Sequence, residues 1–77
     1  MSEDGGRVRI EVAFDGGQIM GALVSVQSAD ELERALDSGA AGTLALDAED
    51  GRYSVVLQRI VYLKRFSRES RVGFGAG

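Results

Sequence analysis

Residues 7–26, RVRIEVAFDGGQIMGALVSV, predict a β-hairpin and set the fold class. Within residues 7–14 the even-numbered positions are all apolar, which is the pattern of a half-buried strand. The DGG sequence at residues 15–17 follows, and glycine suits the positive φ angles of tight hairpin turns. Residues 18–26 then return as a second strand, interrupted by Gly21, which is typical of a bulge or a bend.

A short helix is expected next along the chain. Ser28 and Glu31 match the capping box S-x-x-E, in which each side chain bonds the backbone amide of the other residue. One apolar stripe recurs at helical spacing, formed by Leu32, Ala35 and Leu36. Gly39 is typical of a residue that ends a helix. The sequence therefore predicts a helix of about ten residues that begins at Ser28 and docks on the sheet, because so short a helix is marginal alone.

Three more strands are expected after the helix. Residues 43–48 alternate again, and Asp50-Gly51 is the strongest hairpin signal in the chain. The run 52–66 is too long for one ordinary strand. Its alternation breaks at Gln58-Arg59, so we expect a bend there and a last strand over residues 60–66. The prediction is an α+β fold, β-β-α-β-β-β, with one short helix and a curved antiparallel sheet that can close into a small barrel.

The length of 77 residues indicates a single domain, which we place at residues 7–66. Residues 1–6 predict a disordered lead, and residues 67–77 predict a flexible, basic, glycine-rich tail. The polar start lacks a signal-peptide pattern, and no apolar run is long enough for a membrane span. We therefore expect a cytoplasmic protein that does not contact membranes.

Cysteine and histidine are both absent from the sequence. Disulfides and thiolate zinc sites are excluded, and no serine has a histidine to activate it, so we expect neither an enzyme nor a bound cofactor. Asp47, Glu49 and Asp50 could supply oxygen ligands to Ca²⁺, but their spacing is not that of an EF-hand. We interpret them as an exposed turn. A domain this small buries only about 60% of the surface of its unfolded chain, which favours support from a partner chain.

The charge is divided unevenly along the chain. Residues 1–51 contain three basic and eleven acidic side chains, a net −8, whereas residues 52–77 contain six basic and one acidic side chain, a net +5. The basic end also carries aromatic residues, and its candidate contact residues are Arg59, Tyr62, Lys64, Arg65, Phe66, Arg68, Arg71 and Phe74. Such residues could bind phosphates and stack on bases, could discourage edge pairing, or could dock on the acidic half of another copy.

The chain resembles a family of short actinobacterial proteins of unknown function. The matching segments are residues 8–10, 28–32, 42–47 with 51–52, 59–63 and 71–75, and among them the Ile-x-Tyr strand and the Arg-Val-Gly-Phe-Gly tail carry the resemblance. It differs from the family in the glycine-rich hairpin and at Lys64-Arg65. The resemblance implies this fold and a bacterial cytoplasmic setting, and it implies no site residues.

A second, weaker resemblance is to the Sm-like barrels of RNA-binding proteins. It rests on the turn leading to Gly21 and on the strand that begins at Arg59-Ile60. A likeness of shape does not carry function. We expect a non-enzymatic protein-interaction module that acts through self-association, as a homo-oligomer, or through a protein partner. The alternative is a small nucleic-acid-binding barrel that uses the basic strand and tail.

Overall fold

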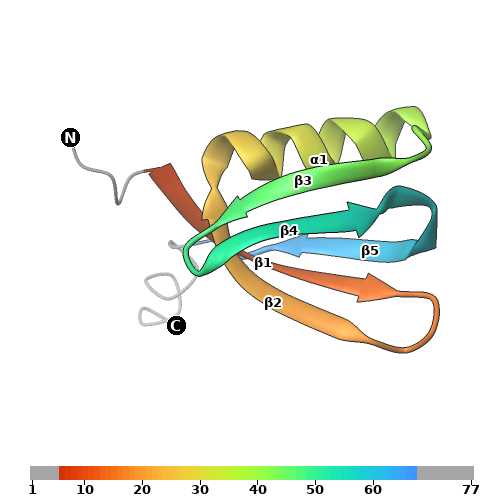
Figure 1. The fold of residues 1–77 in the computed structure, drawn as a ribbon, viewed down its shortest axis with the longest axis horizontal. Coiled ribbons are helices and arrows are strands. Elements are labelled where there is room, and N and C mark those ends of the chain that lie inside the picture. The colour runs from red at the N-terminus through yellow and green to blue at the C-terminus, as the bar shows by residue number, and fades with distance from the viewer. Residues whose placement is uncertain (1–5, 68–77) are drawn as a thin grey trace, which may run out of the picture.

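The computed structural model describes residues 6–67, which form one five-stranded antiparallel sheet and one helix (Figure 1). The elements follow in the order β1 (Arg7–Phe14), β2 (Ile19–Ser25), α1 (Val26–Ser38), β3 (Thr43–Ala48), β4 (Gly51–Val56), the 3-10 turn η2 (Leu57–Arg59) and β5 (Ile60–Arg65). The strands lie side by side in the order β4-β3-β2-β1-β5. The predicted α+β class and order of elements are confirmed.

Glycine shapes the two tight hairpins. Gly17 has a φ of 93° in the turn from β1 to β2, and Gly51 has a φ of 146° where β4 begins opposite Ala48. Residues that carry a side chain rarely adopt these backbone φ angles, so glycine is required at both positions. The Asp50-Gly51 hairpin lies where the sequence predicts it. Gly21 does not form the expected bulge, since the β1–β2 register runs through it without a break.

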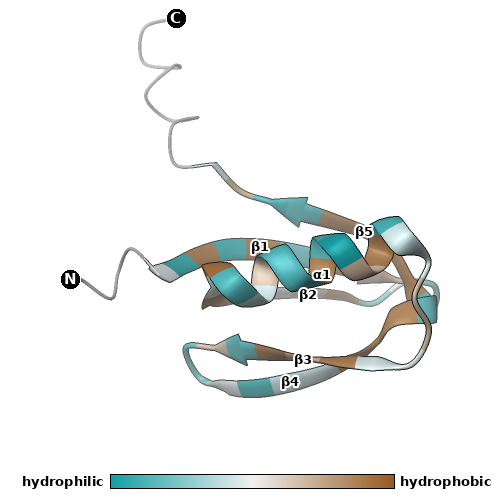
Figure 2. Ribbon diagram, turned by 90° about the horizontal axis from the view of Figure 1, so that it is seen from above, coloured by the Kyte–Doolittle hydropathy of each residue, from teal (hydrophilic) through white to brown (hydrophobic). Residues whose placement is uncertain are grey.

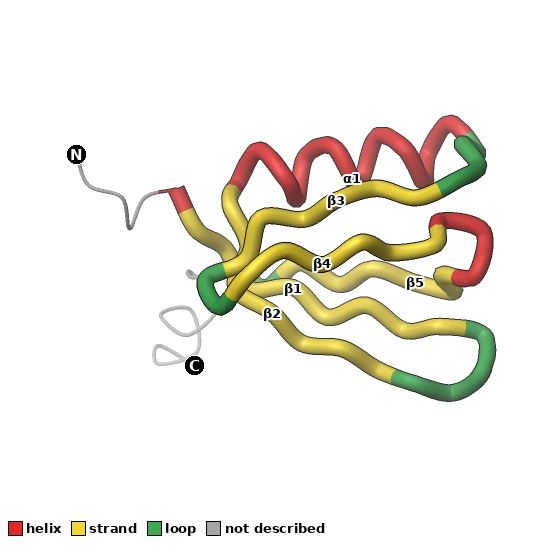
Figure 3. The backbone as a smooth tube through the Cα atoms, viewed as in Figure 1, coloured by secondary structure: helices red, strands yellow, loops and turns green. Residues whose placement is uncertain are grey.

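The sheet is open, and the closure into a barrel considered from the sequence does not occur. Strand β2 pairs with β3 only through Val24 and Ala48, because the chain leaves β2 directly into α1 (Figure 3). Away from this one pair, the β3–β4 hairpin diverges from β1, β2 and β5 (Figure 2). The turn η2 returns the chain to β5 without pairing β4 to β5. This turn is the bend that the sequence predicts at Gln58-Arg59.

Helix α1 begins three residues earlier than the capping-box pattern predicts. Its N-cap is Ser25, whose side chain accepts a hydrogen bond of 3.0 Å from the backbone N–H of Ser28. Ser28 is not at the cap: it lies inside the helix, is 7% exposed, and its hydroxyl accepts from the backbone N–H of Asp47 on β3 at 2.9 Å. The predicted first residue was wrong because a second serine, Ser25, lies three residues upstream and caps the helix instead. The helix therefore follows β2 without a loop. Gly39 ends the helix as predicted, with a φ of 72°.

Replacing Ser28 with alanine is expected to lower the free energy of unfolding by about 1 kcal/mol, because the Asp47 amide loses its bond to the helix. Urea unfolding followed by circular dichroism measures this change. The matched control is Ser38→Ala, since Ser38 donates only to the exposed carbonyl of Ala35 at the end of the helix. A Ser28 variant as stable as the Ser38 variant would contradict the bridging role of Ser28.

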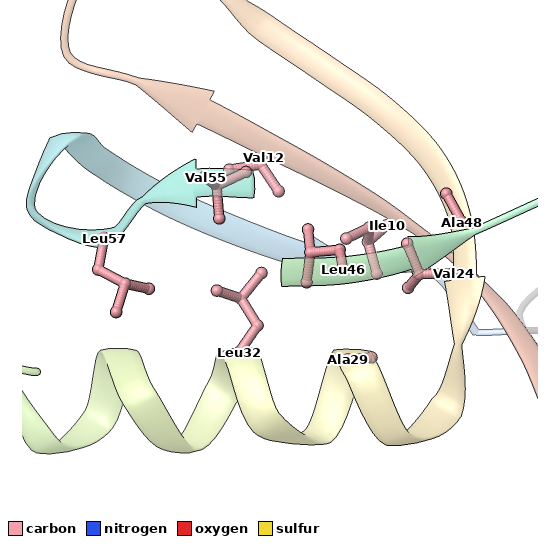
Figure 4. Packing of buried hydrophobic residues seen from close by; sticks show 9 residues of the cluster. All are labelled: Ile10, Val12, Val24, Ala29, Leu32, Leu46, Ala48, Val55 and Leu57. Carbon is pink, nitrogen blue, oxygen red and sulfur yellow. The ribbon is translucent and has the colours of Figure 1, made fainter. Parts of the chain in front are cut away.

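The core lies between α1 and the concave side of the sheet. Leu32 and Ala29 point from the helix towards Ile10, Leu46 and their neighbours (Figure 4). The largest side chains with no exposure are Ile10, Leu32, Leu46, Val12 and Val24. The four strand residues among them share the inward side of their strands, and Leu32 belongs to the apolar stripe of α1, so the sequence pattern selects them. Within residues 6–67, no helix is long and apolar enough to cross a lipid bilayer.

Candidate interaction surface

The side of β2, β1 and β5 turned away from α1 forms a surface that we call the outer face. Three of its rows span all three strands and read Leu23–Arg9–Phe66, Gly21–Glu11–Lys64 and Ile19–Ala13–Tyr62, and the pair Ser25–Arg7 continues the same side before the first row. The first row extends past the end of β5, because the backbone N–H of Phe66 donates to the Arg9 carbonyl at 3.0 Å. Alternation along each strand places all these residues on one side.

The outer face exposes apolar side chains that no other element within residues 6–67 covers. Ile19 is 63% exposed, Leu23 is 38% exposed and Tyr62 is 43% exposed. Val61, beside a register shift between β5 and β1, is 64% exposed. The one other exposed large apolar residue in the described part of the chain is Val56, on β4 at the far edge of the sheet. Exposed apolar side chains that gather on one face mark interaction sites, whereas single ones are ordinary.

Charged groups lie among the apolar ones and are held in place. The hydroxyl of Tyr62 donates to Glu11 Oε2 at 2.5 Å. Lys64 Nζ lies 4.6 Å from the centre of the Phe66 ring, and Arg9 Cζ lies 5.6 Å from it. Both cations are therefore within the range of attraction to an aromatic ring. The three rows carry two positive charges and one negative charge, and Arg7 adds a positive charge beyond the first row. The aromatic side chains Tyr62 and Phe66 have fixed neighbours.

Both tyrosines of the chain are expected to deprotonate above the ordinary pKa of 10.0. The hydrogen bond to Glu11 is the main cause that raises the pKa of Tyr62, and the hydrogen bond to Asp50 does the same for Tyr53. Because folding raises each pKa, the stability that each bond gives is fully present below the unfolded-state pKa of 10.0. It is lost as the pH rises through the folded-state value.

Absorbance of the tyrosinate form against pH measures the two midpoints. Glu11→Gln should lower the midpoint of Tyr62 towards the ordinary value and leave that of Tyr53 unchanged. Asp50→Asn should lower the midpoint of Tyr53 and leave that of Tyr62 unchanged. If both midpoints stay where they are in Glu11→Gln, the Tyr62–Glu11 bond does not exist in solution.

Arg65 faces the other side of the sheet from Lys64. Its guanidinium contacts Asp30 at 3.0 Å and Glu33 at 2.8 Å, and so joins β5 to α1. The hydrogen bond to Asp30 and the charges of both carboxylates raise the pKa of Arg65 above its ordinary value. Its side chain is 28% exposed. The sequence groups Lys64 and Arg65 in one basic end, but their side chains lie on opposite sides of the sheet, because neighbouring residues of a strand point in opposite directions.

The remaining candidates from the sequence lie elsewhere. Arg59 is exposed in η2 and contacts Asp15 at 3.9 Å, away from the three rows. Arg68, Arg71 and Phe74 lie outside the described residues, as do almost all of the predicted lead and tail. Among the candidates within residues 6–67, the structure brings together Tyr62, Lys64 and Phe66 on the outer face.

Sequence reasoning missed the contribution of β1 and β2 to this face. Every second residue of these two strands points away from the core, and the residues in question are Arg9, Glu11, Ile19 and Leu23. The alternation of the sequence already shows that these residues lie on the outward side of their own strands. They form a common surface only because β2 and β5 pair with β1, and the sequence does not reveal that arrangement. No group of three or more carboxylates suited to a metal ion occurs between residues 6 and 67.

Comparison with protein-family models, with curated proteins and with solved structures found no match for this chain. The actinobacterial resemblance and the Sm-like resemblance therefore stay predictions from the sequence.

Proposed function

We propose that the protein is a small non-enzymatic interaction module that acts through self-association or a protein partner. The observation that supports this most is the outer face, where Ile19, Leu23 and Tyr62 expose apolar area around ordered charges. A pattern of aromatic, arginine and aliphatic side chains is typical of protein interfaces. The absence of histidine and cysteine from the sequence removes the usual catalytic nucleophile and base pairs. A bacterial cytoplasmic setting belongs to the same proposal.

A lysine at position 19 tests this function directly. Ile19→Lys places a charge in the apolar part of the face and should weaken association at least about tenfold, which corresponds to about 1.4 kcal/mol. The matched control is Val56→Lys, since Val56 is 44% exposed but lies on β4. Sedimentation of the purified protein, run beside affinity capture on the immobilised full chain, compares the two variants.

The proposal expects one stoichiometric associate, either a second copy or another protein, that Val56→Lys retains and Ile19→Lys loses. An associate that both variants retain equally would place the interaction elsewhere on the molecule. The absence of any associate would remove the proposed function.

Single-stranded nucleic acid is a second candidate partner. The observation that favours it is the Phe66 ring with Arg9 and Lys64 beside it, because such a group can stack a base while it neutralises phosphates. The carboxylate of Glu11 in the next row opposes this function. With about four phosphate contacts, the log–log dependence of affinity on salt would have a slope near −3 for a single strand. Fluorescence anisotropy with labelled single-stranded RNA measures it, and no binding at low salt would exclude this candidate.

A further inference from the structure

We infer that a second copy of this chain occupies the outer face, packed sheet against sheet about a two-fold axis. The inference rests on the proposed function. It names the partner and the way in which the residues of the two outer faces align. The three rows of the outer face, each read from β2 across β1 to β5, supply the residues that face each other in such a pair. Two antiparallel sheets that pack in this way lie about 10 Å apart, with a modest twist between their strands.

Charge decides where the axis can lie. An axis along β1 would place Arg9 against the second copy's Arg9 and Glu11 against the second copy's Glu11. An axis across the strands over Glu11 would again bring each Glu11 onto its copy. An axis over Val12 would place Glu11 against Ala13, a facing residue without charge. Facing like charges cost several kcal/mol, and a carboxylate covered without a facing cation is also costly.

An axis that crosses the strands over Ile10 avoids these costs for Arg9 and Glu11. It leaves Arg7 opposite Ala13 at the edge of the face, where the Arg7 guanidinium keeps its bond to the Asp47 carbonyl at 2.9 Å. It places Arg9 opposite the second copy's Glu11 and, by symmetry, Glu11 opposite the second copy's Arg9. One charge pair therefore occurs twice. In the same arrangement, Lys64 faces the second copy's Phe66, which offers a further ring contact to each cation.

The shape of the face agrees with this register. Leu23, in the first row, faces the second copy's Gly21, in the middle row. Gly21 is exposed, and a Cβ added to it would meet only the carbonyl of Ile10, at 4.0 Å, so there is open space above its backbone. A leucine side chain can occupy that space in each copy. The position where the sequence suggested a bulge thus becomes a receiving site for an apolar side chain.

The size of the face limits the affinity. Three strands of about seven residues cover a flat area of roughly 300 Å², from the spacing of strands and the rise per residue. A typical stable interface buries about 800 Å² on each partner. We therefore expect a dimer that dissociates on dilution, so its mass must be measured over a range of concentrations.

Reciprocal charge reversal tests the register. Arg9→Glu alone brings two carboxylates together at each pair, and Glu11→Lys alone brings two cations together, so each variant should sediment as a monomer at concentrations where the wild type is a dimer. An equimolar mixture restores both pairs, and it should sediment as a dimer. Circular dichroism of each variant checks that the fold is retained.

A mixture that stays monomeric while the wild type dimerises would overturn the register, as would a single variant that dimerises like the wild type. A wild type that stays monomeric throughout would overturn the second copy as occupant. The Ile19→Lys capture experiment separates that failure from failure of the proposed function, because another protein can still depend on the outer face.

Discussion

Replacing Leu32 with alanine should lower the free energy of unfolding by about 3 kcal/mol. Leu32 has no exposed surface and is the largest side chain that α1 contributes to the core. Its loss removes apolar contact and leaves a cavity between the helix and the sheet (Figure 4). A domain of this size has a total stability of roughly 4–12 kcal/mol, so the change is a large share of it.

Urea unfolding followed by circular dichroism gives the difference, and Leu23→Ala is the matched control. Leu23 is 38% exposed on the outer face, so its truncation should cost less than about 1 kcal/mol in the dilute monomer. Equal midpoints for the two variants would contradict the placement of α1 over the core.

Reversing the charge of Arg65 should have the second largest effect, a loss of about 2 kcal/mol. The change removes the bonds to Asp30 and Glu33 and replaces them with repulsion among three carboxylates. The Asp30 and Glu33 side chains are 44% and 53% exposed, so solvent screens part of the attraction and the estimate stays at the lower end for charged pairs. The bond to Asp30 and the charges of both carboxylates raise the pKa of Arg65, so the stability that its charge contributes is lost only as the pH rises through the folded-state pKa.

Lys64→Glu is the control, since it reverses the same charge one residue away on the opposite side of β5. It should change the stability by no more than about 0.5 kcal/mol, as exposed positions do. Urea unfolding compares the free energies of unfolding of the two variants at low and high salt. Salt should reduce the difference between the two free energies. Equal losses in Arg65→Glu and Lys64→Glu would mean that Arg65 does not join β5 to α1.

The strands were predictable because their signals are local. Alternation fixes the inward side of each strand. The glycines of the two hairpins supply the positive φ angles that the tight turns require. The start of α1 was not predictable to the residue, because Ser25 and Ser28 both satisfy cap chemistry. The structure decides between them, because Ser25 accepts from the Ser28 amide as the cap, and the Asp47 amide on β3 donates to the Ser28 hydroxyl inside the helix.

The candidate surface was predictable only in part, because it depends on which strands are neighbours. The charge split pointed to β5 but treated Lys64 and Arg65 as one patch. Their opposite directions follow from strand geometry, whereas the carboxylates that hold Arg65 come from a helix more than thirty residues away in sequence. The open sheet was equally hidden, since it results from the direct passage of β2 into α1.

The most direct test of the outer face is a dilution series of methyl-labelled full-length protein followed by nuclear magnetic resonance. The account predicts that the methyl signals of Ile19 and Leu23 shift with concentration, while that of Val56 on β4 stays fixed. Shifts at Val56, or at Leu36 and Leu63 on the other side of the sheet, without shifts at Ile19 and Leu23 would contradict the account.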